Sequence, residues 1–141
     1  VLVDWELLIL FMGLFVVNHA LQDTGLVQRA LDGLAAKGLH FSEPGVLFGA
    51  TLVLSNLVSN VPAVMLLLPA AEGPQAGATL ALVSTLAGNL LIVGSIANII
   101  VVDAARKCGI TIDWKMHARV GLPVTVLTLG ITAGWLALQT S

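Results

Sequence analysis

Long apolar stretches, separated by short polar segments, limit what this sequence can fold into. The clearest stretch is VGLPVTVLTLGITAGWLALQ at residues 120–139, which holds no charged side chain. Only 10% of the 141 residues are charged, whereas ordinary soluble domains carry roughly 25%. Hydrophobic residues make up 57% of the chain, so a water-exposed surface could not be covered with charge. We therefore expect an all-α integral membrane protein that crosses the cell (inner) membrane several times.

Three segments are predicted to span the membrane as helices, namely 1–22, 77–106 and 117–139. A spanning helix needs about 20 predominantly apolar residues, which each segment supplies. Trp5 and Trp135 lie near the ends of the first and last segments. Tryptophans gather at membrane–water interfaces, so both positions fit the ends of spanning helices.

A shorter segment, 24–38, is predicted to lie along the membrane surface. Leu26, Ala30, Leu31 and Leu34 recur at helical spacing, and polar or charged residues occupy most positions between them. This pattern is typical of an amphipathic helix in the interface.

The stretch SNLVSNVPAVMLLLP at residues 55–69 places two Ser-Asn pairs and Pro62 in the middle of an apolar segment. The apolar arm on each side has about 10 residues, or about 15 Å as a helix, half of the roughly 30 Å hydrocarbon thickness. Neither arm could span the bilayer alone. Residues 45–70 are therefore predicted to form a re-entrant hairpin with a polar tip.

The spanning segment 77–106 also carries polar interruptions. Gly88-Asn89 and Gly94-Ser95 fall near its middle, and Asn98 follows soon after. Glycine weakens a helix, while Asn and Ser side chains offer hydrogen bonds to the backbone groups that a broken helix frees. We expect a discontinuous helix here.

Two neighbouring breaks at membrane depth indicate a binding site. Non-helical backbone is tolerated there only where protein or a water-filled cavity surrounds it, and paired breaks are typical of secondary transporters. Helix N-termini attract anions, whereas unwound carbonyls, Ser hydroxyls and Asn oxygens suit a small cation such as sodium. The alternative for each Ser or Asn is a hydrogen bond that only holds helices together.

These two stretches also resemble a known group of proteins. SNLVSNVPAVMLLLP, followed by GNLLIVGSIANIIVVDAARKCG, resembles the second half of the ion-transporter superfamily. That superfamily includes arsenite permeases, divalent-anion/sodium symporters and NhaD-type sodium/proton antiporters. DWELLILFMGLFVVNHAL is similar to the helix before the hairpin in the arsenite-permease branch, so the resemblance covers nearly the whole chain.

The resemblance implies a fold and a site. The fold would be one of two inverted repeats, the C-terminal half of a longer transporter. The substrate would be bound by Ser55, Asn56, Ser59, Asn60, Gly94, Ser95, Ala97 and Asn98. The coupling ion, sodium, would be bound by Ser59, Asn60, Gly88, Asn89 and Asn98. Leu57 and Val61 stand where the symporters carry Thr, which favours the arsenite-permease-like or general-anion branch over a dicarboxylate carrier.

The expected function is secondary active transport of small anions or oxyanions between the hairpin tip and the unwound helix. The alternatives are a sodium/proton antiporter of the same superfamily and a non-transporting structural subunit. Expected partners are the lipid bilayer, the N-terminal half of the transporter and a small anion, and a homodimer is left open. The net charge of −2 argues against nucleic acid. No His-Glu-x-x-His or Gly-x-Ser-x-Gly pattern is present, so neither an enzyme nor a cofactor is expected.

Charge also predicts the orientation. Four bases in residues 106–119 place this loop in the cytoplasm, whereas residues 70–77 carry Glu72 and no base. The hairpin would then enter from outside.

Several single residues have a structural and a functional interpretation. Asp103 is the candidate for proton coupling, although an anchoring pair with Arg106 is favoured. Asn18 and His19 are interpreted as interfacial anchors rather than a proton relay. Close helix packing is expected at four glycines, Gly13, Gly49, Gly77 and Gly130.

Overall fold

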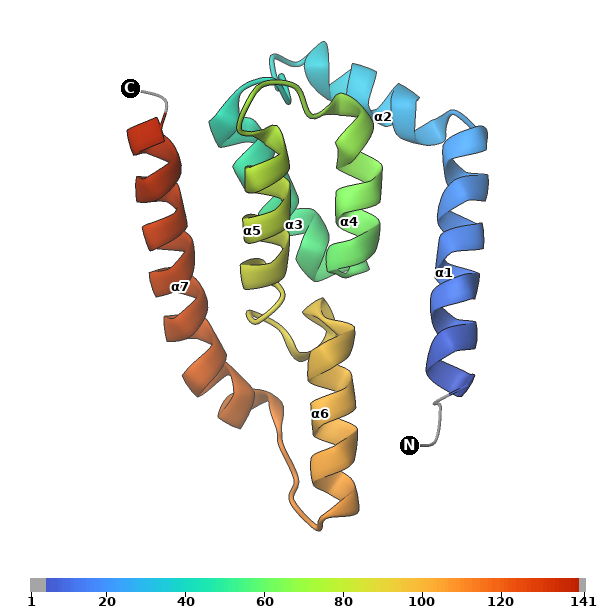
Figure 1. Cartoon of the computed structure of the whole chain (residues 1–141), viewed down its shortest axis with the longest axis vertical. Coiled ribbons are helices and arrows are strands. Elements are labelled where there is room, and N and C mark those ends of the chain that lie inside the picture. The colour runs from blue at the N-terminus through green and yellow to red at the C-terminus, as the bar shows by residue number, and fades with distance from the viewer. Residues whose placement is uncertain (1–4, 140–141) are drawn as a thin grey trace. The chain divides into compact units, whose positions relative to one another are not determined.

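The computed structural model describes residues 5–139, without the side chains of residues 6, 7, 10 and 11. Every regular element in that range is a helix, which confirms the expected all-α class (Figure 1). The chain divides into two compact units, Val1–His40 and Phe41–Ser141, each with its own internal contacts.

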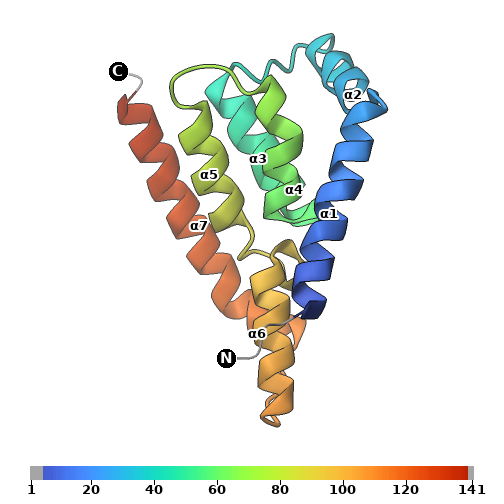
Figure 2. The same ribbon diagram turned by 45° about the vertical axis from the view of Figure 1, so that its right-hand side comes forward.

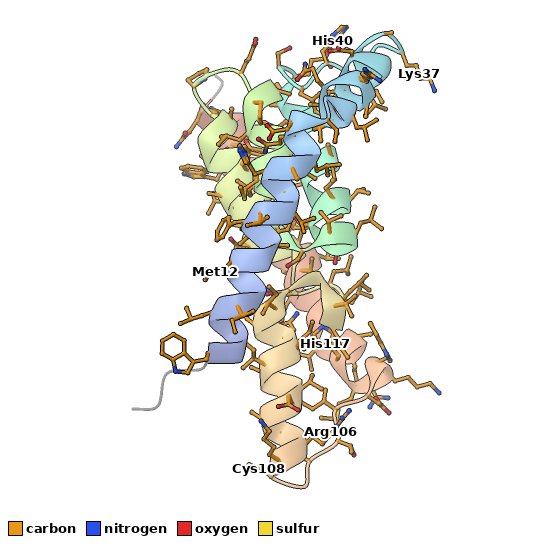
Figure 3. The ribbon with its side chains drawn as sticks, turned by 90° about the vertical axis from the view of Figure 1, so that its right-hand side faces the viewer. Met12, Lys37, His40, Arg106, Cys108 and His117 are labelled. Carbon is orange, nitrogen blue, oxygen red and sulfur yellow. The ribbon has the colours of Figure 1, made fainter. Side chains whose placement is uncertain are left out.

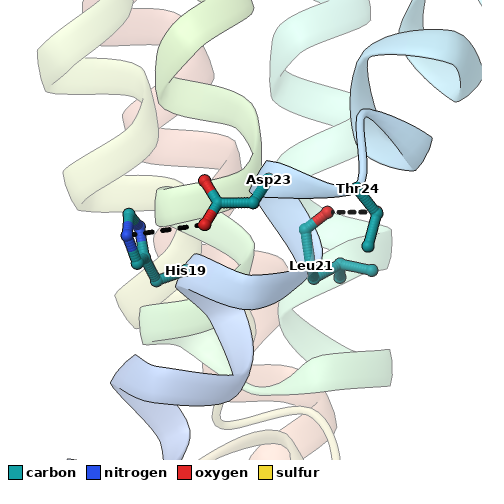
Figure 4. Close-up of polar contacts among 4 residues, drawn as sticks. All are labelled: His19, Leu21, Asp23 and Thr24. Carbon is teal, nitrogen blue, oxygen red and sulfur yellow. Dashed lines mark hydrogen bonds and ion pairs between the residues drawn. The ribbon is translucent and has the colours of Figure 1, made fainter.

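The first unit holds α1 (Trp5–Asp23) and α2 (Leu26–Ala35). A tight turn joins them, in which Gly25 has a φ of 67°. The Thr24 hydroxyl donates to the Leu21 carbonyl at 2.6 Å and satisfies one of the last carbonyls of α1 (Figure 4). The predicted helix 1–22 begins with four residues that lie outside the described range.

The last turn of α1 carries an ion pair between exposed side chains. His19 Nε2 lies 3.7 Å from the Asp23 carboxylate, four residues further along the helix (Figure 4). An exposed pair of this kind suits a helix end at a polar surface.

The second unit begins with two helices packed against each other, α3 (Pro44–Val58) and α4 (Asn60–Leu67), followed by the short 3-10 helix η1 (Leu68–Ala70). Only Ser59 separates α3 from α4. The helices contain 15 and 8 residues, so each is shorter than the roughly 20 residues of a membrane span.

The next pair of helices is interrupted in its middle. α5 (Ala76–Ala87) ends, the 3-10 helix η2 (Ile92–Gly94) follows, and α6 (Ile96–Lys107) begins. Figures 1 and 2 both show α6 extending away from the end of α5 through this irregular segment. We call residues 88–95 the break.

The last helix, α7 (Trp114–Gln139), starts where Asp113 caps it, because the Met116 amide donates to Asp113 Oδ1 at 2.7 Å. Pro123 lies inside this helix rather than in its first turn. Within the described residues, α7 is the helix that is both long and apolar enough to cross a membrane.

The interior of the second unit is built around α5, which packs against α3, α4 and α7. Side chains buried there include small hydroxyl residues beside leucines, for example Thr51, Ser55, Thr79 and Leu80. Large apolar side chains such as Val126 remain exposed. Small residues inside and apolar residues outside are typical of helices that pack together in a bilayer.

Many of the hydroxyl groups bond within their own helix. Thr51 donates to the Leu47 carbonyl at 2.7 Å, and Thr132 donates to the Thr128 carbonyl at 2.8 Å. Back-bonding of this kind satisfies a hydroxyl where water is absent.

Candidate functional site

The break between α5 and α6 brings two glycines into contact. A Cβ on Gly94 would lie 3.1 Å from the Gly88 carbonyl oxygen, and a Cβ on Gly88 would lie 3.2 Å from Ser95 Cβ. Both distances are shorter than ordinary van der Waals contacts, so the backbone can fold back on itself here only because side chains are missing. The two glycines therefore fix the sharp path of the break.

Asn56 of α3 contacts the break from the hairpin side. Its Nδ2 donates to the Leu52 carbonyl at 3.0 Å and to the Ala87 carbonyl at 3.1 Å, the latter at the last residue of α5. This second bond joins two helices through a carbonyl that also accepts the Leu90 amide at 3.0 Å. Asn56 Oδ1 points at Gly94 so closely that a Cβ there would lie 2.8 Å away.

Asn98 of α6 contacts the break from the other side. Its Nδ2 donates to the Gly88 carbonyl at 2.8 Å and to the Leu91 carbonyl at 3.2 Å. An amide NH₂ has two hydrogens, so both are used on the unwound backbone. Asn98 therefore bridges the two ends of the break.

Two side-chain oxygens of α3 are buried without a hydrogen-bond partner in the described part of the chain. They are Ser55 Oγ, on a fully buried residue, and Asn56 Oδ1. Buried oxygens without a donor are costly, and such groups in native proteins call for a ligand, an ion or water. Of the two, Asn56 Oδ1 faces Gly94, so it is the oxygen at the break that could accept a hydrogen bond or bind an ion.

The hairpin tip has a strained backbone at Ser59. Its φ of 75° and ψ of 160° lie in a region that is essentially restricted to glycine, at a cost of about 1–3 kcal/mol. The Ser59 hydroxyl lies 3.3 Å from Asn60 Oδ1, to which it donates. Strain of this kind at a polar tip indicates a functional constraint on the backbone.

The remaining predicted site residues lie at helix starts. Asn60 begins α4 and Ser95 precedes α6, and neither helix has a side-chain cap on its first N–H groups. Ala97 is exposed in the first turn of α6. Contacts thus join Asn56, Gly88, Gly94, Ser95 and Asn98 around the break, whereas the Ser59 and Asn60 side chains hydrogen-bond to each other.

Sequence reasoning missed two residues of α7 that contact the break. His117 Nε2 lies 3.0 Å from the Asn89 carbonyl oxygen, and a Cβ on Gly121 would lie 2.5 Å from the same oxygen. The sequence signal for this contact would have been a histidine and a glycine four residues apart, which lie on one face of the last helix.

The close-packing expectation for glycines is wrong at the four positions chosen. In the described structure a Cβ on Gly13, Gly49, Gly77 or Gly130 would meet nothing within 4 Å. Close approach occurs instead at Gly88, Gly94 and Gly121, where the irregular segment folds against α3, α6 and α7.

Asp103 has a different partner from the one expected. Its carboxylate lies 2.8 Å from Lys107 Nζ rather than pairing with Arg106, because an acid four residues before a lysine is the favoured arrangement on a helix. Both side chains are more than half exposed. Arg106 and Cys108 lie at the end of α6 opposite the break (Figure 3). Asp103 is thus not among the residues that contact the break.

The arrangement as a whole offers oxygen ligands and free N–H groups rather than acid–base chemistry. Among the described residues no group of three or more His, Cys, Asp or Glu side chains could hold a metal ion. Uncapped helix starts, unwound carbonyls and Asn or Ser side chains suit reversible binding of small ions.

Comparison with known proteins identifies the family. The sequence model of the citrate transporter family matches residues 2–87. A silicon efflux transporter of Oryza sativa subsp. japonica is 37% identical over 92% of this chain and 30% of its own length. The 46 kDa membrane protein of Mycobacterium leprae is 31% identical over 97% of this chain and 35% of its own length.

An arsenical pump membrane protein of Escherichia coli is 26% identical over 97% of this chain and 34% of its own length. This similarity confirms the resemblance to arsenite permeases. The chain spans about a third of the length of these curated relatives. No solved structure matches it. The family match covers more than half of the chain, which is therefore a membrane protein that belongs to the citrate transporter family of transporters.

Proposed function

We propose that this chain forms one half of the binding site of a secondary active transporter for small anions or oxyanions. The solute would bind near the bilayer midplane, between the hairpin tip and the break. One observation carries the proposal: Asn56 and Asn98 both donate to the unwound backbone, and Asn56 Oδ1 is buried against it without a hydrogen-bond partner. A buried oxygen of this kind supports a bound ion, solute or water at the break.

The anion would be bound mainly by the free N–H groups at the starts of α4 and α6. Both helix starts lack a side-chain cap, and the positive end of each helix dipole attracts negative charge. The proposed substrate-binding residues are those at the hairpin tip and at the second half of the break, Ser55, Asn56, Ser59, Asn60, Gly94, Ser95, Ala97 and Asn98.

Sodium is proposed as the coupling ion, carried together with the solute. Its oxygen ligands would come from Ser59, Asn60, Gly88, Asn89 and Asn98. The carbonyls of Gly88 and Asn89 each accept one side-chain hydrogen bond, which leaves a second lone pair on each oxygen for a cation. The two unpartnered oxygens of Ser55 and Asn56 support a cation in the same neighbourhood.

The names of the relatives narrow the class of solute. They refer to citrate, silicon and arsenicals, which suggests a small solute rich in oxygen. A site of N–H and amide groups, without a basic side chain at its centre, fits a compact solute of low charge better than a large polyanion.

A structural subunit without transport activity is the second candidate. It is favoured by the fact that Asn56 and Asn98 both donate to backbone carbonyls, as residues that only hold helices together would. The two candidates differ in what happens when one of these side chains is removed.

The test uses the whole transporter that carries this sequence, reconstituted in lipid vesicles. Uptake of radiolabelled citrate, arsenite and silicic acid is measured with and without an inward sodium gradient. We expect sodium-stimulated uptake of at least one solute, its loss in Asn98→Leu, and its retention in Ser84→Ala, since Ser84 bonds only within α5. No uptake of any solute by the unmodified protein would favour the structural subunit, and equal uptake by Asn98→Leu and the unmodified protein would show that Asn98 only holds helices together.

A further inference from the structure

The break receives a third polar contact, which comes from α7. We propose that His117 and Gly121 form a seat for the Asn89 carbonyl, and that this seat sets the position of the unwound segment. His117 would thus be a positioning residue for the site. The inference rests on the proposed function, because it concerns the accuracy of the same solute site.

Three consecutive carbonyls are held by three different helices. Asn56 of α3 donates to Ala87, Asn98 of α6 donates to Gly88, and His117 of α7 lies within hydrogen-bond distance of Asn89. In a regular helix these carbonyls would be satisfied by amides further along the same helix. Here the Ala87 carbonyl accepts the Leu90 amide as well as Asn56, whereas the side chains of Asn98 and His117 take the place of backbone amides at Gly88 and Asn89.

The contact of His117 with the Asn89 carbonyl requires a hydrogen on Nε2. A backbone carbonyl can only accept, so Nε2 must carry the proton and donate to the Asn89 oxygen, 3.0 Å away. The donor is therefore the ring nitrogen farthest from the backbone. A glutamine places an amide nitrogen at a similar reach, whereas a leucine has no donor.

Gly121 provides the other wall of the seat. It is buried, and a Cβ at this position would lie 2.5 Å from the Asn89 oxygen and 3.1 Å from His117 Nε2. Any side chain would push the carbonyl away. The glycine lies one helical turn after the histidine, so both contact the carbonyl from one face of α7.

The first turn of α7 is held in place by its cap. The Met116 amide donates to Asp113 Oδ1 at 2.7 Å, and the His117 amide donates to the Asp113 carbonyl at 3.0 Å. In Figure 3 His117 lies beside the start of α6, at the level of the break. The ring therefore projects from a fixed turn.

A cavity of about 350 Å³ adjoins the seat and is lined by Ile112, Met116, Val120 and Val124 together with the seat residues. Because this space is open, packing alone would not hold the Asn89 carbonyl in position. The hydrogen bond from His117 and the absence of a side chain at Gly121 therefore hold the Asn89 carbonyl in position.

The experiment compares five variants of the whole transporter in lipid vesicles: His117→Leu, His117→Gln, Gly121→Ala, and the controls Gly130→Ala and Gly134→Ala. A Cβ at either control position on α7 meets nothing within 4 Å. The probe is whichever of citrate, arsenite or silicic acid the unmodified protein takes up. KM and maximal rate are measured separately.

We expect His117→Leu and Gly121→Ala to raise KM by about five- to tenfold, the change that the loss of one hydrogen bond produces. His117→Gln should restore KM to within about twofold, since its amide replaces the donor. Both controls should match the unmodified protein. Unchanged KM in His117→Leu and Gly121→Ala would overturn the seat. If the transporter does not assemble with His117→Leu, the KM of Gly121→Ala alone tests the seat.

A second measurement does not depend on transport. A cysteine placed at the exposed Val93, in a Cys108→Ala background, reports the position of the break through its rate of maleimide labelling. His117→Leu and Gly121→Ala should change this rate, and His117→Gln and Gly130→Ala should not. An unchanged rate in both seat variants would overturn the seat. A changed rate, with no uptake of any solute by the unmodified protein, would keep the seat while rejecting the proposed function.

Discussion

Asn98 links the two halves of its own interrupted helix through the carbonyl of Gly88, 2.8 Å from its amide nitrogen and ten residues earlier in the sequence. The same nitrogen reaches Leu91 within the break. One side chain thus substitutes for the backbone hydrogen bonds that an unbroken helix would have made. Asn98 in this way ties the first turn of α6 to the start of the break and defines the path of the backbone between them.

The first prediction is that Asn98→Leu abolishes transport. The substitution removes both donors to the break and exposes no charge. Removal of a buried hydrogen-bond partner lowers the free energy of unfolding by about 1–3 kcal/mol in soluble proteins. A hydrogen bond between membrane helices contributes about 0.6 kcal/mol on average. We therefore expect folding, followed by size-exclusion chromatography, to survive while uptake falls at least tenfold.

Asn60→Leu should behave in the same way, because Asn60 begins α4 at the hairpin tip. The matched control is Ser84→Ala, on the regular part of α5, which should take up solute normally. Normal uptake by both Asn variants would show that these residues only hold helices together.

The second prediction concerns Gly94. A methyl group there would lie 2.8 Å from Asn56 Oδ1 and 3.1 Å from the Gly88 carbonyl oxygen, so the break would have to open. Gly94→Ala should lower the melting temperature of the purified protein and reduce uptake. Gly49→Ala, where a Cβ meets nothing within 4 Å, is the control. Equal melting temperatures in the two variants would contradict this geometry.

The third prediction separates the backbone of Ser59 from its hydroxyl. Ser59→Gly relieves the positive φ and should raise stability by about 1 kcal/mol, whereas Ser59→Ala keeps the strain. If the hydroxyl binds the coupling ion, both variants should lose sodium stimulation of uptake. Thermal unfolding and sodium titration measure the two effects independently. Full sodium stimulation in Ser59→Ala would exclude the hydroxyl as a ligand.

The fourth prediction concerns orientation in the membrane. If residues 45–70 form a re-entrant hairpin, cysteines introduced at Gly45 and Glu72 should both be labelled from outside the cell, because such a hairpin enters and leaves the membrane on one side. Cys108 is exposed at the end of α6 and should be labelled only from the cytoplasm. Cys108→Ser provides the unlabelled background. Labelling of Gly45→Cys and Glu72→Cys from opposite sides would mean that residues 45–70 span the bilayer.

Local sequence patterns were sufficient to predict the all-α class and the break. Gly88, Asn89, Gly94 and Ser95 interrupt an apolar run, and the helix is indeed irregular between Ala87 and Ile96. Such signals are local, since glycine weakens a helix wherever it stands. Clustered Asn residues likewise indicated that the freed carbonyls would need donors.

Contacts between helices could not be predicted in this way. His117 and Gly121 contact Asn89, although each lies at least 28 residues later in the sequence. The sequence around Asn89 does not predict that contact. The glycines predicted to pack closely lie in regular helices. A glycine there allows close packing only where another helix lies directly against it. Their environment depends on tertiary packing, which the periodicity of one helix does not specify.

The start of α7 was misjudged for a similar reason. Apolar character begins near residue 120, but the Asp113 cap starts the helix at Trp114 and carries polar residues into its first turns. Capping, rather than hydropathy, decides where a helix begins. Pro123 therefore stands inside the helix, where it has no N–H to donate to the carbonyl of residue 119.

The hydroxyl groups that bond within their own helix have a mechanical consequence. Ser84 of α5 and Thr132 of α7 both donate to carbonyls of the helix that carries them, so neither is a cross-link between the two helices. Sliding α7 along α5 would leave both of these bonds intact. The break, by contrast, is tied to three helices at once. A shift of α7 along α5 would therefore break neither of these hydroxyl bonds, whereas it would have to break the contact between His117 and Asn89.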